Sequence, residues 1–224
     1  MAKSLNVVPL SCAAMSVLLS VALVIGLPVS TGAARIRDAN ARRSVVRVHT
    51  FTCSGEMFGT GVVLADGTIM TNNHVVASAR RVEIDVPGGA VGATGLSSSG
   101  SADLAIVTLP VRVAAGLEVM ADPIVGVTGR LVGFPGGHDQ QDRPAALRTF
   151  EAGNIGAEPD RVARLDARVV PGESGSPLIV GERIAALVYQ SGSDTGEARA
   201  VAGTELRQAL TAVRPIEFVS CQTR

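Results

Sequence analysis

Short runs of apolar, mostly β-branched residues alternate with turn-forming residues along most of the chain. In the first half, the runs that predict strands are residues 44–48, 61–64, 68–71, 81–86, 90–95 and 104–109. Asp66 and Gly67 form a hairpin signal between the second and third of these runs. Residues 97–101 contain only serine and glycine, and they predict a flexible loop that delivers Asp103.

The second half repeats this pattern. Its predicted strands are residues 129–134, 148–155, 161–165, 177–180, 183–190 and 198–202. Residues 204–213 differ, because Leu206, Leu210 and Val213 have helical spacing and predict a terminal helix. Roughly a dozen short strands with regularly spaced turn signals are typical of paired β-barrels. The pattern therefore predicts an all-β protein with two barrels and a C-terminal helix.

The N-terminal segment has a different character, because residues 5–34 carry no charge and residues 13–27 are strongly apolar. Lys3 before this core, Pro28 after it and the small residues 31–34 fit a cleavable signal peptide. The same uncharged stretch is also long enough to span a bilayer of ~30 Å as an uncleaved anchor. Both alternatives place the rest of the chain outside the cytoplasm, secreted or held at the membrane.

Composition and charge limit the function classes. The 224 residues are 46% hydrophobic, which is enough for one or two compact cores. The 20 basic and 20 acidic residues cancel, so no basic face for a nucleic acid is expected. Residues 35–43 are polar and predict a linker, followed by a domain over residues 44–224 with barrels at about 44–115 and 116–224. No metal or cofactor is expected, and the oligomeric state is open.

Three cysteines bear on the redox environment. Cys12 lies in the export segment, which leaves Cys53 and Cys221 as an even pair. In an oxidising compartment such a pair favours one disulfide. The alternative, two separate buried thiols, stays open.

Three segments carry candidate chemistry. Residues 171–177 read Pro-Gly-Glu-Ser-Gly-Ser-Pro, residues 71–76 read Thr-Asn-Asn-His-Val-Val, and residues 101–107 read Ser-Ala-Asp-Leu-Ala-Ile-Val. A serine hydroxyl becomes a nucleophile only beside a base and near donors that stabilise an oxyanion. The chain order is His, Asp, Ser, whereas α/β-hydrolases run Ser, Asp, His and subtilisins run Asp, His, Ser.

These segments predict a catalytic triad of His74, Asp103 and Ser174. His74 would act as the general base, and Asp103 would hold its imidazole in the right tautomer. Gly172 permits the backbone twist that points its own N–H and that of Ser174 into one oxyanion hole. For Glu173 we expect a surface position or a local hydrogen bond.

Together these motifs resemble those of the chymotrypsin-like (trypsin-fold) serine proteases, in which T-x-x-H-V, D-L-A and P-G-x-S-G-x-P recur. Residues 59–61, 133–137 and 181–184 add matching glycine-containing turns, and the resemblance runs from residue 44 to the C-terminus. It is strongest to the bacterial HtrA/MarP-type exported peptidases. The resemblance implies two six-stranded antiparallel β-barrels. Two positions depart from the family's motif. Glu173 stands where Asp or Asn is usual, and Ser176 stands where Gly is usual.

The resemblance also implies a substrate-binding pocket around Arg168, Tyr189, Gln190 and Ser191. Arg168 stands where trypsins carry the carboxylate that selects Arg or Lys, so trypsin-like specificity is not expected. The predicted function is an exported serine endopeptidase that acts on proteins or peptides through an acyl-enzyme. The alternative is a catalytically inactive barrel pair that serves as a binding or scaffolding module of the cell envelope.

Overall fold

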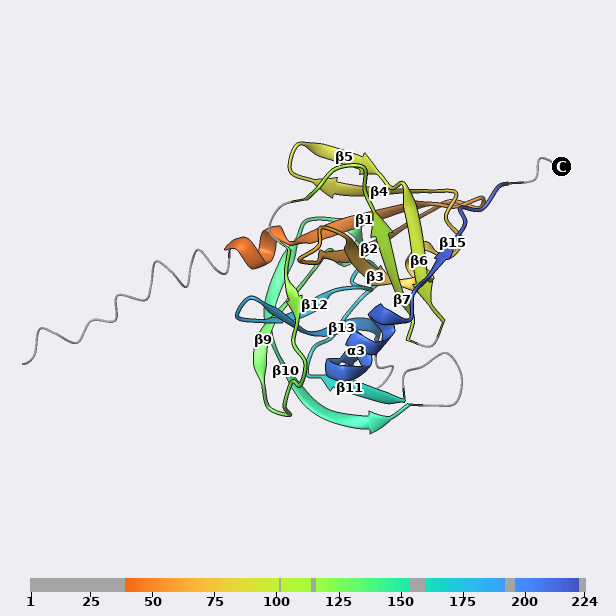
Figure 1. Cartoon of the computed structure of the whole chain (residues 1–224). Coiled ribbons are helices and arrows are strands. Elements are labelled where there is room, and N and C mark those ends of the chain that lie inside the picture. Colours follow the sequence, from red (N-terminus) through yellow and green to blue (C-terminus); the bar gives the residue numbers. More distant parts are fainter. Residues whose placement is uncertain (1–38, 101, 114–115, 154–159, 192–195, 222–224) are drawn as a thin grey trace, which may run out of the picture. The chain divides into compact units, whose positions relative to one another are not determined.

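The computed structural model describes residues 39–100, 102–113, 116–153, 160–191 and 196–221 (Figure 1). The predicted export segment, residues 1–34, lies outside these residues, as do residues 35–38 of the predicted linker, whereas residues 39–43 of that linker are helical. Within the described ranges, no helix is long and apolar enough to cross a membrane.

The first half of the domain forms an antiparallel sheet. Its strands are β1 (Val45–Phe51), β2 (Glu56–Val63), β3 (Ile69–Asn72), β4 (Arg81–Val86), β5 (Gly89–Gly92), β6 (Gly95–Ser99) and β7 (Leu104–Thr108). The eighth strand, β15 (Arg214–Ile216), comes from the C-terminal end and pairs with β6. The order is β15-β6-β7-β3-β2-β1-β4-β5. Val46, Val48, Ile69, Ile84 and Val107 are among the residues that fill its core.

This first sheet differs from the closed six-stranded barrel that we expected. Among the described residues no ladder joins its edge strands β5 and β15, so the sheet curves into a half-barrel. Strand β5 is short, has glycine at both ends and is exposed at three of its four positions. It therefore brings no apolar face that could close a barrel.

The second half forms the closed barrel. Its sheet contains β8 (Glu118–Val119), β9 (Thr128–Gly133), β10 (Gln141–Ala152), β11 (Arg161–Leu165), β12 (Pro177–Val180), β13 (Arg183–Ser191) and β14 (Ala198–Ala202). The order is β12-β9-β10-β11-β14-β13-β8, and an additional ladder between β12 and β13 closes the first six strands into a barrel. Leucine and alanine side chains fill the inside, including Leu131, Leu147, Leu165, Leu178 and Ala186.

A third apolar cluster joins the two halves. It contains Val62, Met70 and Leu104 from the first sheet and Val132, Ile179 and Leu187 from the second, all of them buried. Burial of apolar surface contributes about 25 cal/mol per Å². This shared core therefore holds the two sheets, and the turns at their edges, in a fixed relative position.

The prediction of a flexible loop at residues 97–101 is wrong for residues 97–99, which belong to a strand. Residues 95–99 form β6, which pairs with β7 along Gly95–Ser99 and with β15 on its other side. Leu96 and Ser99 are buried. Serine-rich sequence has a low strand propensity, and here pairing on both sides overrides it.

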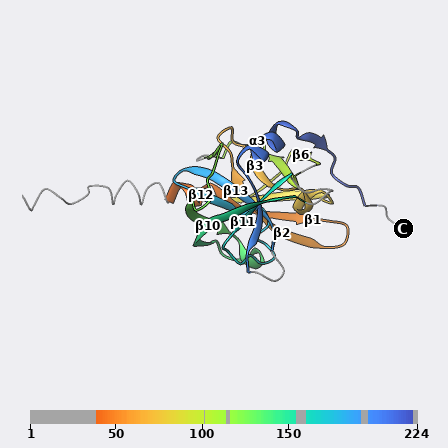
Figure 2. The same ribbon diagram turned by 90° about the horizontal axis from the view of Figure 1, so that it is seen from below.

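The predicted C-terminal helix is α3 (Gly203–Thr211), which buries Leu206 and Ala209. It leads into β15 beside β6 (Figures 1 and 2). The tail after β15 then reaches the segment just before β4, where the Val219 N–H donates to the Ala79 carbonyl over 2.8 Å. There the sulfur atoms of Cys221 and Cys53 lie 2.03 Å apart, which is a disulfide distance.

Candidate active site

His74 and Asp103 meet at the end of β3. His74 lies in the single-turn helix α2 (Asn73–Val76), and its Nδ1 is 2.6 Å from Asp103 Oδ2. The backbone N–H of His74 donates to the other carboxylate oxygen, Asp103 Oδ1, over 2.9 Å. Both oxygens of the carboxylate therefore contact the same residue, which fixes the plane of the imidazole.

The backbone of Asp103 is bound by the two residues that precede His74. Its φ is +47°, in the left-handed region that costs about 1–2 kcal/mol for a residue with a Cβ. Its carbonyl accepts hydrogen bonds from the Asn73 N–H and the Asn72 Nδ2, each over 3.0 Å. These bonds offset the strain, and they give the two asparagines before His74 a role that the sequence motif alone did not assign.

Ser174 lies in a turn where glycine is required. Gly172 has φ +92° and Gly175 has φ +89°. A Cβ on Gly172 would come within 2.5 Å of the Phe134 carbonyl oxygen, and one on Gly175 within 2.0 Å of the Thr60 carbonyl oxygen. Thr60 of β2 also binds the turn directly: its N–H donates to the Ser174 carbonyl and its Oγ1 to the Gly172 carbonyl, each over 2.8 Å.

A hydrogen bond of the neighbouring peptide orients one of the two predicted oxyanion donors. The Pro171 carbonyl accepts the Gly136 N–H over 2.7 Å. In a trans peptide the C=O and the following N–H point in opposite directions, so this bond turns the Gly172 N–H away from Gly136. Within the described residues neither the Gly172 N–H nor the Ser174 N–H has an acceptor. Two unpaired N–H donors within one backbone turn are what an oxyanion needs.

Glu173 differs from the surface position that we expected. Its side chain is 1% exposed, and its Oε1 is 2.6 Å from Arg143 Nη1 of β10. The other oxygen accepts the Val170 N–H over 3.0 Å, so the expected local hydrogen bond is present. Burial of a carboxylate is costly unless it is paired, and Arg143 supplies the charge. Arg143 lies 30 positions before Glu173, which is why no local pattern indicated it.

His74 and Ser174 both line one cavity of about 370 Å³. On one side it is bounded by Met57, Phe58 and Val75, and on the other by Val169, Val170, Pro171, Gly172, Val188, Tyr189 and Gln190. None of the described residues that line it is Asp, Glu, Lys or Arg. The His74 side chain is 43% exposed, so a substrate can reach it.

The predicted pocket residues divide into three groups. Tyr189 and Gln190 line the cavity. Arg168 does not: its side chain is exposed, and its carbonyl accepts Arg143 Nη2 over 2.7 Å. Ser191 is the last residue of β13, and its side chain lies outside what the structure describes. Val169, Val170 and Val188 add aliphatic residues to the pocket wall.

A model of the trypsin-like peptidase domain matches residues 59–184, a range that includes His74, Asp103 and Ser174. The chain belongs to the trypsin-like peptidase family. Among curated relatives of this family, the serine protease Rv3671c of Mycobacterium tuberculosis H37Rv is 30% identical over 165 residues, which cover 69% of this chain and 42% of that protein. A glutamyl endopeptidase of Staphylococcus epidermidis is 28% identical over 167 residues, which cover 62% of this chain and 56% of that protein. The chain thus spans about half the length of these curated relatives.

Solved structures of trypsin-like peptidases match the fold. The active form of the Rv3671c protease from M. tuberculosis superposes with a TM-score of 0.72 and 26% identity, covering 82% of this chain and 86% of that one. The HtrA-type protease AlgW with a tripeptide gives a TM-score of 0.66 and 23% identity, covering 77% and 61% of the two chains. The second likeness bears on the fold alone. Both agree with the resemblance noted from the sequence motifs.

Proposed function

We propose that this trypsin-like peptidase is a serine endopeptidase with His74, Asp103 and Ser174 as its catalytic triad. One observation carries the proposal: His74 is bound by both oxygens of Asp103 on one side and lines the same cavity as Ser174 on the other. Polypeptides are the substrates. The uncharged segment at residues 5–34 supports an extracytoplasmic location, either secreted or anchored in the membrane.

The geometry suggests how each group acts. The Nδ1–H of His74 donates to Asp103, which leaves Nε2 free to take the proton of the Ser174 hydroxyl. The Ser174 oxygen attacks the scissile carbonyl, and the N–H groups of Gly172 and Ser174 stabilise the resulting oxyanion. His74 then returns the proton to the leaving amine. Water hydrolyses the acyl-enzyme by the same steps in reverse.

An activity-based probe tests this proposal against an inactive scaffold. We expect a fluorophosphonate to label the purified protein at Ser174, because only a hydroxyl with a working base and oxyanion donors reacts with such a probe. Peptide mass spectrometry locates the label, and heat-denatured protein is the control. A folded protein that stays unlabelled would support the scaffold instead.

The cavity indicates which residue precedes the cleaved bond. Its wall contains Val169, Val170 and Val188, and apart from His74 its described lining has no basic side chain to pair with an acidic residue and no carboxylate to pair with a basic one. We therefore infer a preference for small or medium aliphatic residues at P1, unlike the glutamate specificity named for the staphylococcal relative.

A peptide library measures this preference directly. We expect cleavage mainly after Ala, Val or Leu. Val170→Ala should shift the preference toward larger residues, because Val170 lines the cavity and is 40% exposed, so its truncation widens the pocket. Ile124→Ala is the control, since Ile124 is 72% exposed and does not line the cavity. Dominant cleavage after Glu, Arg or Lys would contradict the inference.

A further inference from the structure

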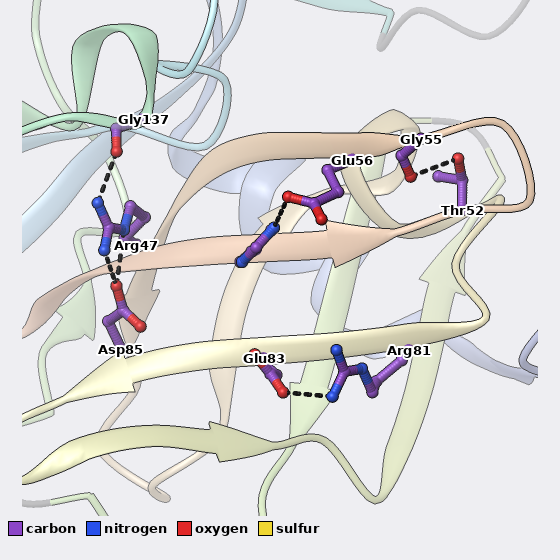
Figure 3. Close-up of polar contacts among 9 residues, drawn as sticks. Arg47, Thr52, Gly55, Glu56, Arg81, Glu83, Asp85 and Gly137 are labelled. Carbon is purple, nitrogen blue, oxygen red and sulfur yellow. Dashed lines mark hydrogen bonds and ion pairs between the residues drawn. The ribbon is translucent and has the colours of Figure 1, made fainter.

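Arg47 of β1 links the first sheet to a turn of the second. Its Nη1 donates to the Gly137 carbonyl over 2.6 Å (Figure 3). Its Nε and Nη2 both bind Asp85 Oδ2 of β4, at 2.6 and 2.5 Å. Because the guanidinium is planar and its donors form a rigid fork, holding it at Asp85 also fixes where Nη1 points. We call these two residues the Arg47–Asp85 clamp.

The strand register explains the position of the clamp. Arg47 pairs with Asp85 between β1 and β4 and with Thr60 between β1 and β2. Directly paired residues of antiparallel strands lie on the same face, so the three side chains form a row across three strands. Thr60, at one end of this row, is fully buried, and its hydroxyl donates to the Gly172 carbonyl. Arg47 is its neighbour on the same face.

The turn that Arg47 binds is η1 (Pro135–Gly137). Gly136 and Gly137 have φ of +64° and +74°, and a Cβ on Gly137 would come within 2.5 Å of the Phe58 ring. The turn is therefore packed against Phe58, which lines the active-site cavity. At its other side the Gly136 N–H donates to the Pro171 carbonyl, the bond that orients the Gly172 N–H.

We propose that the Arg47–Asp85 clamp positions the oxyanion hole from the opposite sheet. Arg47 holds the Gly137 carbonyl and so fixes η1, and η1 in turn holds the Pro171 carbonyl. The Gly172 N–H then stays directed toward the substrate. The inference rests on the proposed function, because it concerns the same oxyanion. Both residues are positioning residues, since neither lines the cavity.

A second ion pair, both members of which lie on the strand that carries Asp85, offers a matched control. Arg81 and Glu83 lie 2.7 Å apart on β4, as Figure 3 also shows, and no contact joins them to η1 among the described residues. The side chains of the clamp are 35% and 36% exposed, and those of the control pair 54% and 25%. Partly exposed pairs of this kind contribute little to stability. A general effect of losing one ion pair should therefore be similar for both.

The test measures kcat and KM for Arg47→Met, Arg47→Lys and Asp85→Asn beside the controls Arg81→Met and Glu83→Gln. We expect Arg47→Met to lower kcat by roughly 10- to 100-fold, less than the loss of a whole oxyanion donor, with little change in KM. Arg47→Lys should recover part of the loss, because an ammonium can still donate to the Gly137 carbonyl. Asp85→Asn should follow in the same direction, and the two controls should stay within about twofold of the parent.

A peptide boronate, which forms a tetrahedral adduct in the oxyanion hole, adds a readout that a merely structural role would not move. Its inhibition constant should rise in Arg47→Met by the same factor as kcat/KM falls, at an unchanged melting temperature. Equal kcat for folded Arg47→Met and folded Arg81→Met would overturn the proposal. If Arg47→Met does not fold, Asp85→Asn decides by the same criteria. An inactive parent protein refutes the proposed function, whereas an active parent with an unaffected clamp variant refutes this inference alone.

Discussion

Ser174→Ala is expected to abolish peptide hydrolysis, with a loss on the order of 10⁴-fold or more. The substitution removes the nucleophile and leaves the base and the oxyanion donors in place, so substrate can still bind. The side chain is only partly buried, and its hydroxyl makes no hydrogen bond within the described residues that the fold would lose. The melting temperature should therefore remain that of the parent.

Ser176→Ala is the matched control for this experiment. Ser176 is in the same turn and is fully buried, and its Oγ has no hydrogen-bond partner among the described residues. Removing an unpaired buried hydroxyl is close to neutral or slightly stabilising. Activity should survive in Ser176→Ala. Turnover that persists in Ser174→Ala, or that disappears equally in both variants, would contradict the nucleophile assignment.

The second large effect is expected from the bond between Cys53 and Cys221. Joining residues 168 positions apart restricts the unfolded chain and stabilises the fold by roughly 4 to 5 kcal/mol in the loop-entropy model, less any native strain. Reduction, or the double substitution Cys53→Ala with Cys221→Ala, should therefore lower the melting temperature by several degrees. Non-reducing mass spectrometry of the protein, purified without reductant, should find the two cysteine peptides linked.

Reduction should also lower activity, because the tail that carries Cys221 supports His74, the proposed general base. Strand β15 pairs with Ser98 of β6, and Ser98 Oγ donates to Asn73 Oδ1 over 2.7 Å. Asn73 precedes His74 and binds the Asp103 carbonyl. Cys12→Ala is the control for an effect of thiols in general. Two free thiols at positions 53 and 221 in freshly exported, folded protein would disprove the linkage.

The local sequence carried much of the fold. The predicted strands at residues 81–86, 161–165, 177–180 and 198–202 have the bounds of β4, β11, β12 and β14. Apolar alternation and adjacent turn residues are properties of a few neighbouring positions, and they sufficed there. The three candidate triad residues were found in the same way, from the residues directly beside them, and the structure brings two of them into contact and all but Asp103 to one cavity.

Features that depend on distant partners were not predictable in this way. Strand β6 looked like a loop because its ladders with β7 and β15 lie outside any local window. Glu173 was expected near the surface because its counter-ion, Arg143, is on another strand. The backbone of Arg168, and not its side chain, is tied to the same guanidinium, which directs the side chain outward. In each case the deciding contact joins residues far apart in sequence.

The internal partner of Glu173 has a consequence for how the protein can be kept inactive. The buried carboxylate beside the nucleophile is neutralised by Arg143, a side chain from the middle of the chain. Within the described residues, Arg143 supplies the charge that in trypsins comes from a newly exposed chain terminus. Membrane-held and released forms should then share one intrinsic turnover rate. We then expect proteolysis to be controlled by the location of the protein and by the polypeptides that reach it there.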